Sequence, residues 1–184
     1  MINYPGKAKS SYTKTVNYSN RGMNLEELIN LSNEYYLQED IAVIYKKPTP
    51  ITIVDASFDS HGRVITKAYF KTPSTLDYNG IYKGKYIDFD AKVTKSKTSF
   101  PLQNLHEHQY EHIKNVIRHG GISFLIISIN SKYYLLDGND IINFIENNNK
   151  KSIPYEYIDK NGILIEAKIK PRLDYIKAID KKYF

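Results

Sequence analysis

The feature that most constrains the fold is a short apolar run in the second half of the chain. Residues 122–129, with the sequence ISFLIISI, form the longest such run and follow Gly120 and Gly121. These eight residues are far fewer than the roughly 20 that cross a membrane, but they are enough for a strand covered on both faces. We therefore predict a buried central strand at 122–129.

Helical and strand-like segments are mixed around this run. Asn24 and Glu27 have the spacing of a capping box, ahead of a helical pattern that extends to about residue 38. Segments 51–56 and 63–70 are typical of a hairpin, and Asn79-Gly80 has the signature of a tight turn. Further helices are expected at 105–118, 139–146 and 173–181, and further strands at 41–45, 86–93, 132–136 and 163–169. This mixture predicts an α/β or α+β fold.

The composition is that of an ordinary globular domain. The chain has 184 residues, 41% of them hydrophobic and 25% charged, which suits one domain with a real core. The absence of cysteine excludes a disulfide framework, thiol catalysis and cysteine-ligated zinc. The first ten residues have no apolar segment typical of a secretory signal, so we expect a cytoplasmic protein with no membrane association.

The formal net charge is +6, which by itself favours an anionic partner, either nucleic acid or a membrane surface. The excess lies in residues 1–25, which contain no acid, and in residues 41–100. We predict that residues 1–22 form a flexible basic arm and that residues 23–184 form a single domain. An AT-rich genome also encodes a composition rich in Lys, Ile, Asn and Tyr, so the charge alone does not establish DNA binding.

The strand expected at 86–93 has polar side chains on one face. Its alternation points Asp88, Asp90 and Lys92 to the same side. A half-exposed strand with a weak ion pair has the same pattern. Asp77 favours a second interpretation, because a turn at Asn79-Gly80 would bring it close to the strand that carries Asp90.

Two neighbouring carboxylates favour a bound cation. Their hard oxygen ligands suit Mg²⁺, which also binds phosphate oxygens. Lys92, two residues after Asp90, can then stabilise the negative charge that develops on a phosphate. The three residues are consistent with a metal-dependent phosphodiesterase, although Asp and Lys are common in this chain.

The spacing Asp77-x12-Asp90-Ala91-Lys92 resembles the PD-(D/E)XK nuclease signature. The surrounding sequence resembles the RecU-type Holliday junction resolvases from about residue 18 to the C-terminus. The matching stretches are 18–23, 41–44, 46–50, 68–71, 77–84, 98–104, 108–109 and 171–176. The resemblance implies a restriction-endonuclease-like mixed sheet flanked by helices, with a protruding β-hairpin stalk at about 48–72.

The resemblance also implies roles for individual residues. It places a magnesium site, with Mn²⁺ as a substitute, on Thr75, Asp77, Asp90 and Gln109, and the transition-state lysine on Lys92. Position 90 is usually Glu in the family, and Asp is one methylene shorter. The catalytic set is therefore expected to be Lys92, Asp77 and Asp90.

The same resemblance implies a homodimer that resolves four-way DNA junctions by paired nicks in recombination and repair, with a recombinase as a partner. Arg63, Lys67 and Lys71 of the stalk would face DNA, and Lys46 and Lys47 would contact phosphates at its base. Arg21 is either a linker residue or a contact to DNA or the active site. Expected DNA contacts are therefore Arg21, Lys46, Lys47, Arg63, Lys67 and Lys71.

Two other functions remain open. The first is a non-catalytic DNA-binding protein of the same fold. The second is a zinc hydrolase, because His108, Glu111 and His112 match the inverted zinc-protease motif H-x-x-E-H, and His108 and His112 would lie on one helical face. No third-ligand motif follows, and a chain with five His produces such a match by chance.

Overall fold

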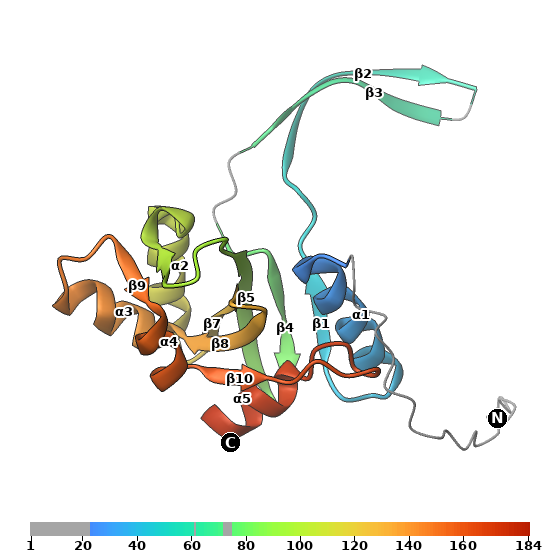
Figure 1. Cartoon of the computed structure of the whole chain (residues 1–184). Helices are drawn as coiled ribbons and strands as arrows, with labels where there is room; N and C mark the ends of the chain where they lie inside the picture. Colours follow the sequence, from blue (N-terminus) through green and yellow to red (C-terminus); the bar gives the residue numbers. More distant parts are fainter. Residues whose placement is uncertain (1–22, 61, 72–74) are drawn as a thin grey trace, which may run out of the picture.

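A computed structural model describes residues 23–60, 62–71 and 75–184. The expected arm at 1–22, including Arg21, lies outside the described residues. A six-stranded sheet in the order β1-β4-β5-β7-β8-β10 forms the centre of the structure (Figure 1). Its strands are β1 (Val43–Lys46), β4 (Tyr78–Tyr82), β5 (Lys85–Val93), β7 (Ile122–Ile129), β8 (Lys132–Asp137) and β10 (Ile163–Ile165).

The predicted central strand is confirmed. β7 lies between β5 and β8, parallel to the first and antiparallel to the second, so the sheet is mixed. Seven of its eight side chains are buried because helices cover both faces of the sheet. No helix in the described part of the chain is long and apolar enough to span a membrane.

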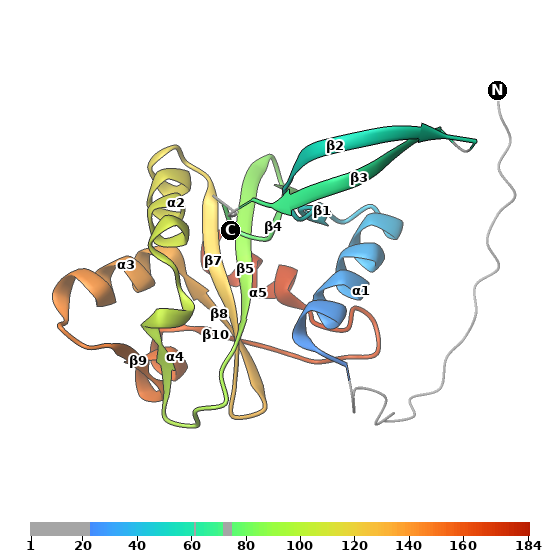
Figure 2. The ribbon, with the colours of Figure 1, turned by 90° about the horizontal axis from the view of Figure 1, so that it is seen from above.

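Two helical layers enclose the sheet (Figure 2). Helices α1 (Leu25–Gln38) and α5 (Tyr175–Tyr183) share one apolar core with Phe89 and Phe124. Helices α2 (Glu107–Arg118), α3 (Gly138–Asn147) and α4 (Tyr155–Asn161) contribute to a second core that includes Leu125 and Ile127. The predicted arrangement of a mixed sheet flanked by helices is confirmed.

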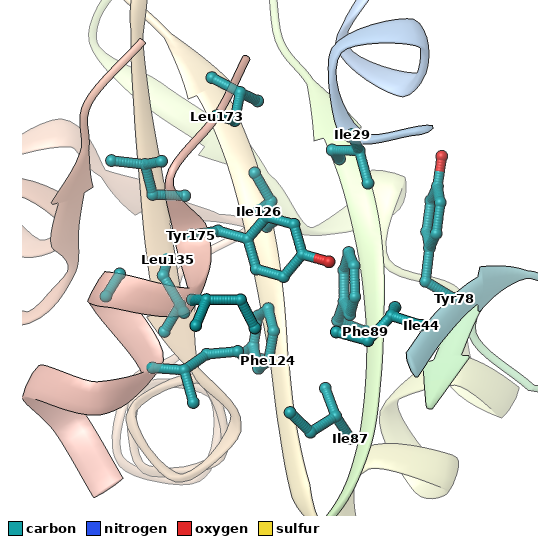
Figure 3. Close-up of a cluster of buried hydrophobic side chains, with 14 of the residues drawn as sticks. Ile29, Ile44, Tyr78, Ile87, Phe89, Phe124, Ile126, Leu135, Leu173 and Tyr175 are labelled. Atoms are coloured by element: carbon teal, nitrogen blue, oxygen red, sulfur yellow. The ribbon is translucent and has the colours of Figure 1, made fainter. Parts of the chain in front are cut away.

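The first core is built around stacked aromatic rings (Figure 3). Phe89 lies between Tyr78 and Phe124, with ring centroids 4.8 Å apart on either side. Tyr175 of α5 packs against Phe89 at 5.3 Å, and its hydroxyl donates a hydrogen bond to Asn33 of α1. This packing fixes β4 and β5 relative to each other and to the helices.

The turn between β4 and β5 differs from the sequence prediction. Asn79 and Gly80 lie inside β4, and the chain reverses at Lys83 and Gly84, which both have positive φ. A Cβ at Gly80 would lie 2.1 Å from the backbone oxygen of Val43. Glycine at position 80 therefore allows β1 to approach β4 closely and does not form the turn.

The predicted hairpin is confirmed as a two-stranded ribbon that extends from the sheet (Figure 1). It consists of β2 (Ile51–Asp59) and β3 (Gly62–Phe70), which pair antiparallel. Every residue of β3 is exposed. The two ends of the ribbon are joined where the Lys71 N–H donates to the Pro50 carbonyl at 3.0 Å.

Other boundaries agree with the sequence less closely. The capping box at Asn24 and Glu27 is present. The strand expected at 163–169 ends at Ile165, and the last helix begins at Tyr175. The sequence did not predict β6 (Ser99–Pro101), β9 (Ser152–Pro154), the 3-10 turn Leu102–Asn104 or α4, because these elements are short and their pairing is non-local.

Candidate active site

Four of the candidate residues come from three neighbouring elements. Asp77 directly precedes β4, Asp90 and Lys92 lie on β5, and Gln109 lies in the first turn of α2. Tyr78 pairs with Phe89 across the β4–β5 ladder, so its extension by one residue places Asp77 opposite Asp90. The hairpin thus brings the two carboxylates together as expected, although through a different turn.

Asp90 is the centre of a buried hydrogen-bond network. Its Oδ2 accepts from Gln109 Nε2 at 2.6 Å and lies 2.9 Å from Lys92 Nζ. Lys92 Nζ also donates to Gln109 Oε1 at 3.1 Å, and the Ala91 N–H donates to Asp90 Oδ1 at 2.7 Å. Because Asp90 is only 1% exposed, these donors replace the water that the carboxylate loses. The network fixes the orientations of Asp90, Lys92 and Gln109.

Asp77 is half-buried and more weakly compensated. Burial raises the pKa of Asp77, and the charge of Asp90 raises that pKa further, while Lys92 and Lys46 lower it. The repulsion between Asp77 and Asp90 shows that their charges sense each other. Positive charge placed between the two carboxylates would relieve that repulsion.

The structure adds a residue that sequence reasoning missed. Glu26, in the first turn of α1, pairs with Lys46, and its charge also raises the pKa of Asp77. Its neighbour Glu27 is occupied in the capping box, where it accepts from the Asn24 N–H at 2.9 Å. The cap at Asn24 was the signal that could have separated the two, because it commits Glu27 and leaves Glu26 on the adjacent side of the helix.

The two lysines at the ribbon base lie in different environments. Lys46 pairs with Glu26. Lys47 Nζ donates to Asp88 Oδ2 at 2.7 Å, so its ammonium is paired with a buried carboxylate and is not freely presented to a phosphate. Thr75 is half-buried, and its hydroxyl donates to the Leu76 carbonyl at 3.3 Å.

The basic residues expected on the stalk are exposed. Arg63 and Lys67 lie on β3, and Lys71 follows it. Lys67 Nζ lies 5.7 Å from the centroid of the Tyr69 ring. All three side chains are accessible to a ligand, so their placement is compatible with the predicted DNA contacts.

The zinc-protease motif does not form a metal site. His112 Nε2 lies 3.3 Å from Asp88 Oδ1, whereas the His108 ring stacks on His106. Glu111 Oε1 lies 3.7 Å from Lys114 Nζ. Among the residues that the structure describes, no three His, Asp or Glu side chains converge to hold a metal ion. The geometry therefore gives no support to a zinc hydrolase.

The candidate site does suit a hard divalent cation that needs fewer protein ligands. Mg²⁺ is often held by only one or two carboxylates and retains several waters. Asp77 and Asp90 supply two neighbouring carboxylates. Burial and the charge of Asp90 raise the pKa of Asp77, and a cation bound between the two groups would favour their ionised forms. Gln109 Oε1 is a neutral oxygen beside them, in contact with Lys92.

Comparison with known proteins gives the family. Residues 20–181 match the family model described as Recombination protein U, RecU. The Holliday junction resolvase RecU of Bacillus cereus (strain B4264) is 50% identical over 188 aligned positions, which cover 99% of this chain and 94% of that protein. The protein of the same name from Bacillus anthracis (strain CDC 684 / NRRL 3495) is 54% identical over 173 aligned positions, which cover 91% of this chain and 86% of that protein. The chain belongs to the RecU family.

Among solved structures, Hjc of Archaeoglobus fulgidus, described as a Holliday junction resolvase from an archaeal hyperthermophile, is similar to this chain. The TM-score is 0.41 at 8% sequence identity, and the match covers 70% of this chain and 86% of that one. At that level of similarity the match adds nothing to the family assignment.

Proposed function

We propose that this protein is an endonuclease that cleaves four-way DNA junctions in homologous recombination and repair, and that it depends on Mg²⁺. The observation that carries the proposal is the convergence of Asp77, Asp90, Lys92 and Gln109 at one end of the sheet. Membership of the RecU family and the printed names of its relatives support the choice of substrate.

The chain's own residues define most of the chemistry. Asp77 and Asp90 form an acidic pocket that would hold a divalent cation, with Gln109 and Thr75 as further oxygen donors. Such a cation, when bound, supplies positive charge to the scissile phosphate and favours ionisation of a nearby water. Lys92 stabilises the negative charge that develops on the phosphate. Gln109 holds Asp90 and Lys92 in their orientations through both ends of its amide.

The exposed ribbon supplies a surface for binding. Arg63 and Lys67 lie on exposed β3 of the ribbon, which extends away from the sheet (Figure 2), so they can reach phosphates remote from the pocket. Lys71 lies at the root of the ribbon, where its N–H donates to the Pro50 carbonyl, and it can contact phosphates there. Phosphate contacts position DNA without reading its sequence. Binding should therefore depend on salt and on the shape of the branched DNA.

Paired nicks require two active sites acting on one junction. The described chain has one such acidic pocket, formed by Asp77 and Asp90, so we propose that two copies of the chain assemble as a homodimer. We propose a recombinase as a further partner. Chemical cross-linking or light scattering would test the dimer, and a monomer that resolves junctions at the same rate would contradict it.

The function is tested by incubating the protein with a four-way junction and with linear duplex, each in Mg²⁺ and in EDTA. Paired, symmetrically placed nicks in the junction that require Mg²⁺ are the expected result. Equal cutting of linear duplex would indicate a nuclease of different selectivity. Tight junction binding without cutting in Mg²⁺ or Mn²⁺ would favour the non-catalytic DNA-binding alternative.

A further inference from the structure

The proposed chemistry leaves a second acidic residue of the same strand unused. Asp88 lies two residues before Asp90 on β5, and its side chain is fully buried. The carboxylate Oδ2 accepts from Lys47 Nζ at 2.7 Å and from the Tyr86 hydroxyl at 2.6 Å. The sequence alone allowed a solvated strand face here, but the structure encloses this carboxylate completely.

Lys47 connects this buried carboxylate to the root of the ribbon. It follows β1 directly, and the chain continues through Pro48 and Pro50 into β2. The backbone N–H of Lys47 donates to the Asp77 carbonyl at 2.7 Å, while its ammonium donates to Asp88. One residue at the ribbon root is therefore attached to both segments that carry the candidate catalytic carboxylates.

The other oxygen of Asp88 faces the helix that carries Gln109. Asp88 Oδ1 lies 3.3 Å from His112 Nε2, and His112 is three residues after Gln109 on α2. Neither atom makes a hydrogen bond to a described residue. Asp88 thus lies between the ribbon root and the helix that orients Asp90.

The burial of Asp88 makes its ion pair with Lys47 important for holding the ribbon root. A fully buried carboxylate needs a cation close to it, and Lys47 supplies one at 2.7 Å with a side chain that is 23% exposed. The ribbon is exposed along all of β3, so its direction depends on how its root is held. Loss of the ion pair would remove the side-chain anchor of the root and leave Lys47 attached through its backbone hydrogen bond to the Asp77 carbonyl.

We propose that the Asp88–Lys47 ion pair is a positioning device that fixes the β2–β3 ribbon relative to the active site. Neither residue is proposed to touch the scissile phosphate, so both are positioning residues. The proposal rests on the proposed function only for its consequence, which is that a junction held by the ribbon meets the acidic pocket in the correct register. The positioning itself is a property of the protein without DNA.

The cysteine-free chain allows a direct test by distance measurement. Spin labels on cysteines introduced as F58C and K160C would report on the ribbon and on α4, since Phe58 is 83% exposed and Lys160 is also exposed. Dilution with unlabelled protein removes distances between copies. A single narrow distance distribution is expected for the labelled protein, and a distribution at least twice as wide is expected after Asp88→Asn or Lys47→Met.

Matched variants separate this effect from general damage. Tyr86→Phe removes the other hydrogen bond to the same carboxylate oxygen without touching the ribbon root, so the distribution should stay narrow. Lys47→Arg retains the cation and should restore most of the narrow distribution. The double variant Asp88→Asn/Lys47→Met leaves no buried charge unpaired and should fold even if a single variant does not. Its distribution should be wide.

Unchanged widths in the folded Asp88→Asn and double variants would overturn the proposal. Broadening by Tyr86→Phe to the same extent would also overturn it, because the effect would then not depend on the ion pair. The distance measurement uses no DNA, so its result is independent of whether the protein cleaves junctions. In a cleavage assay, Asp88→Asn should lower junction cutting relative to duplex cutting on the order of tenfold, because misplacing a substrate reduces the rate.

Discussion

The acidic pocket and the β2–β3 ribbon differ most in how far their side chains are buried. Around Asp90, carboxylate, amide and ammonium groups are buried and hydrogen-bonded to one another before any ligand arrives. On the ribbon, Phe58 and Phe70 are more than four-fifths exposed, at 83% and 84%. The packed sheet therefore holds the proposed catalytic groups in fixed orientations, while the proposed DNA contacts lie on an element with no packed core of its own.

The largest expected effect is on cleavage. Asp90→Asn retains the shape of the side chain but removes the charge that faces Asp77, so the pocket should lose most of its attraction for a divalent cation. We expect junction cleavage to fall roughly 10³-fold with little change in junction binding. A nicking assay combined with a gel-shift assay would check this, and equal losses of binding and cleavage would contradict the division between pocket and ribbon.

The next effect compares the stability of the two regions. Phe89→Ala removes the ring stacked between Tyr78 and Phe124, which should lower the free energy of unfolding by about 3–5 kcal/mol. Phe58→Ala on the ribbon should change it by no more than about 0.5 kcal/mol. Urea denaturation of both variants would measure the difference. Similar losses would show that the ribbon is part of the cooperative core.

Substitutions of two glycines of the β4–β5 hairpin are expected to have smaller effects on stability. Gly80→Ala should destabilise the protein by roughly 2 kcal/mol or more, because its Cβ would meet the Val43 backbone oxygen at 2.1 Å. Gly84→Ala meets no atom within 4 Å and strains only a φ of +73°, so the cost should be about 1 kcal/mol. The reverse order in thermal unfolding would contradict the close approach of β1 to Gly80.

The smallest effect concerns single charges on the ribbon. Lys67→Gln should weaken binding to all DNA substrates by a similar factor and reduce the slope of log K against log salt by about 1. Fluorescence anisotropy at several salt concentrations would measure it. Lys160→Gln, on the exposed surface of α4, is the matched control and should leave the slope unchanged. An unchanged slope for Lys67→Gln would remove that residue from the DNA surface.

Much of the fold was accessible from local sequence patterns. The apolar run 122–129 predicted the central strand, and the capping box at Asn24 located the start of α1. The turn was misplaced because Asn79-Gly80 has the same local signature as a hairpin turn, while the reason for Gly80 is a contact with β1, more than 30 residues earlier in the chain. Short elements such as β9 depend on pairing across the chain and left no local signal.

The candidate site, too, could be predicted from the sequence only where local patterns are sufficient. Spacing and alternation indicated Asp77, Asp90 and Lys92 only weakly, and the resemblance to RecU-type resolvases was needed to choose them. The local capping box commits Glu27, but the proximity of Glu26 to Asp77 depends on how α1 packs against the sheet. Spacing and alternation also did not reveal that Asp88 is buried, because that burial depends on α2 and Lys47 lying over the strand.

Our proposal is that the acidic pocket cuts DNA and that the ribbon selects the junction. It is tested most directly by the ratio of junction to duplex cleavage after residues 51–70 are replaced by a two-residue Gly-Ser link. The Lys71 N–H already donates to the Pro50 carbonyl, so a short link can close the gap without disturbing the sheet. We expect Mg²⁺-dependent cutting of duplex to persist while the preference for junctions disappears. An undiminished preference for junctions, or the loss of all cutting in a folded variant, would contradict the account.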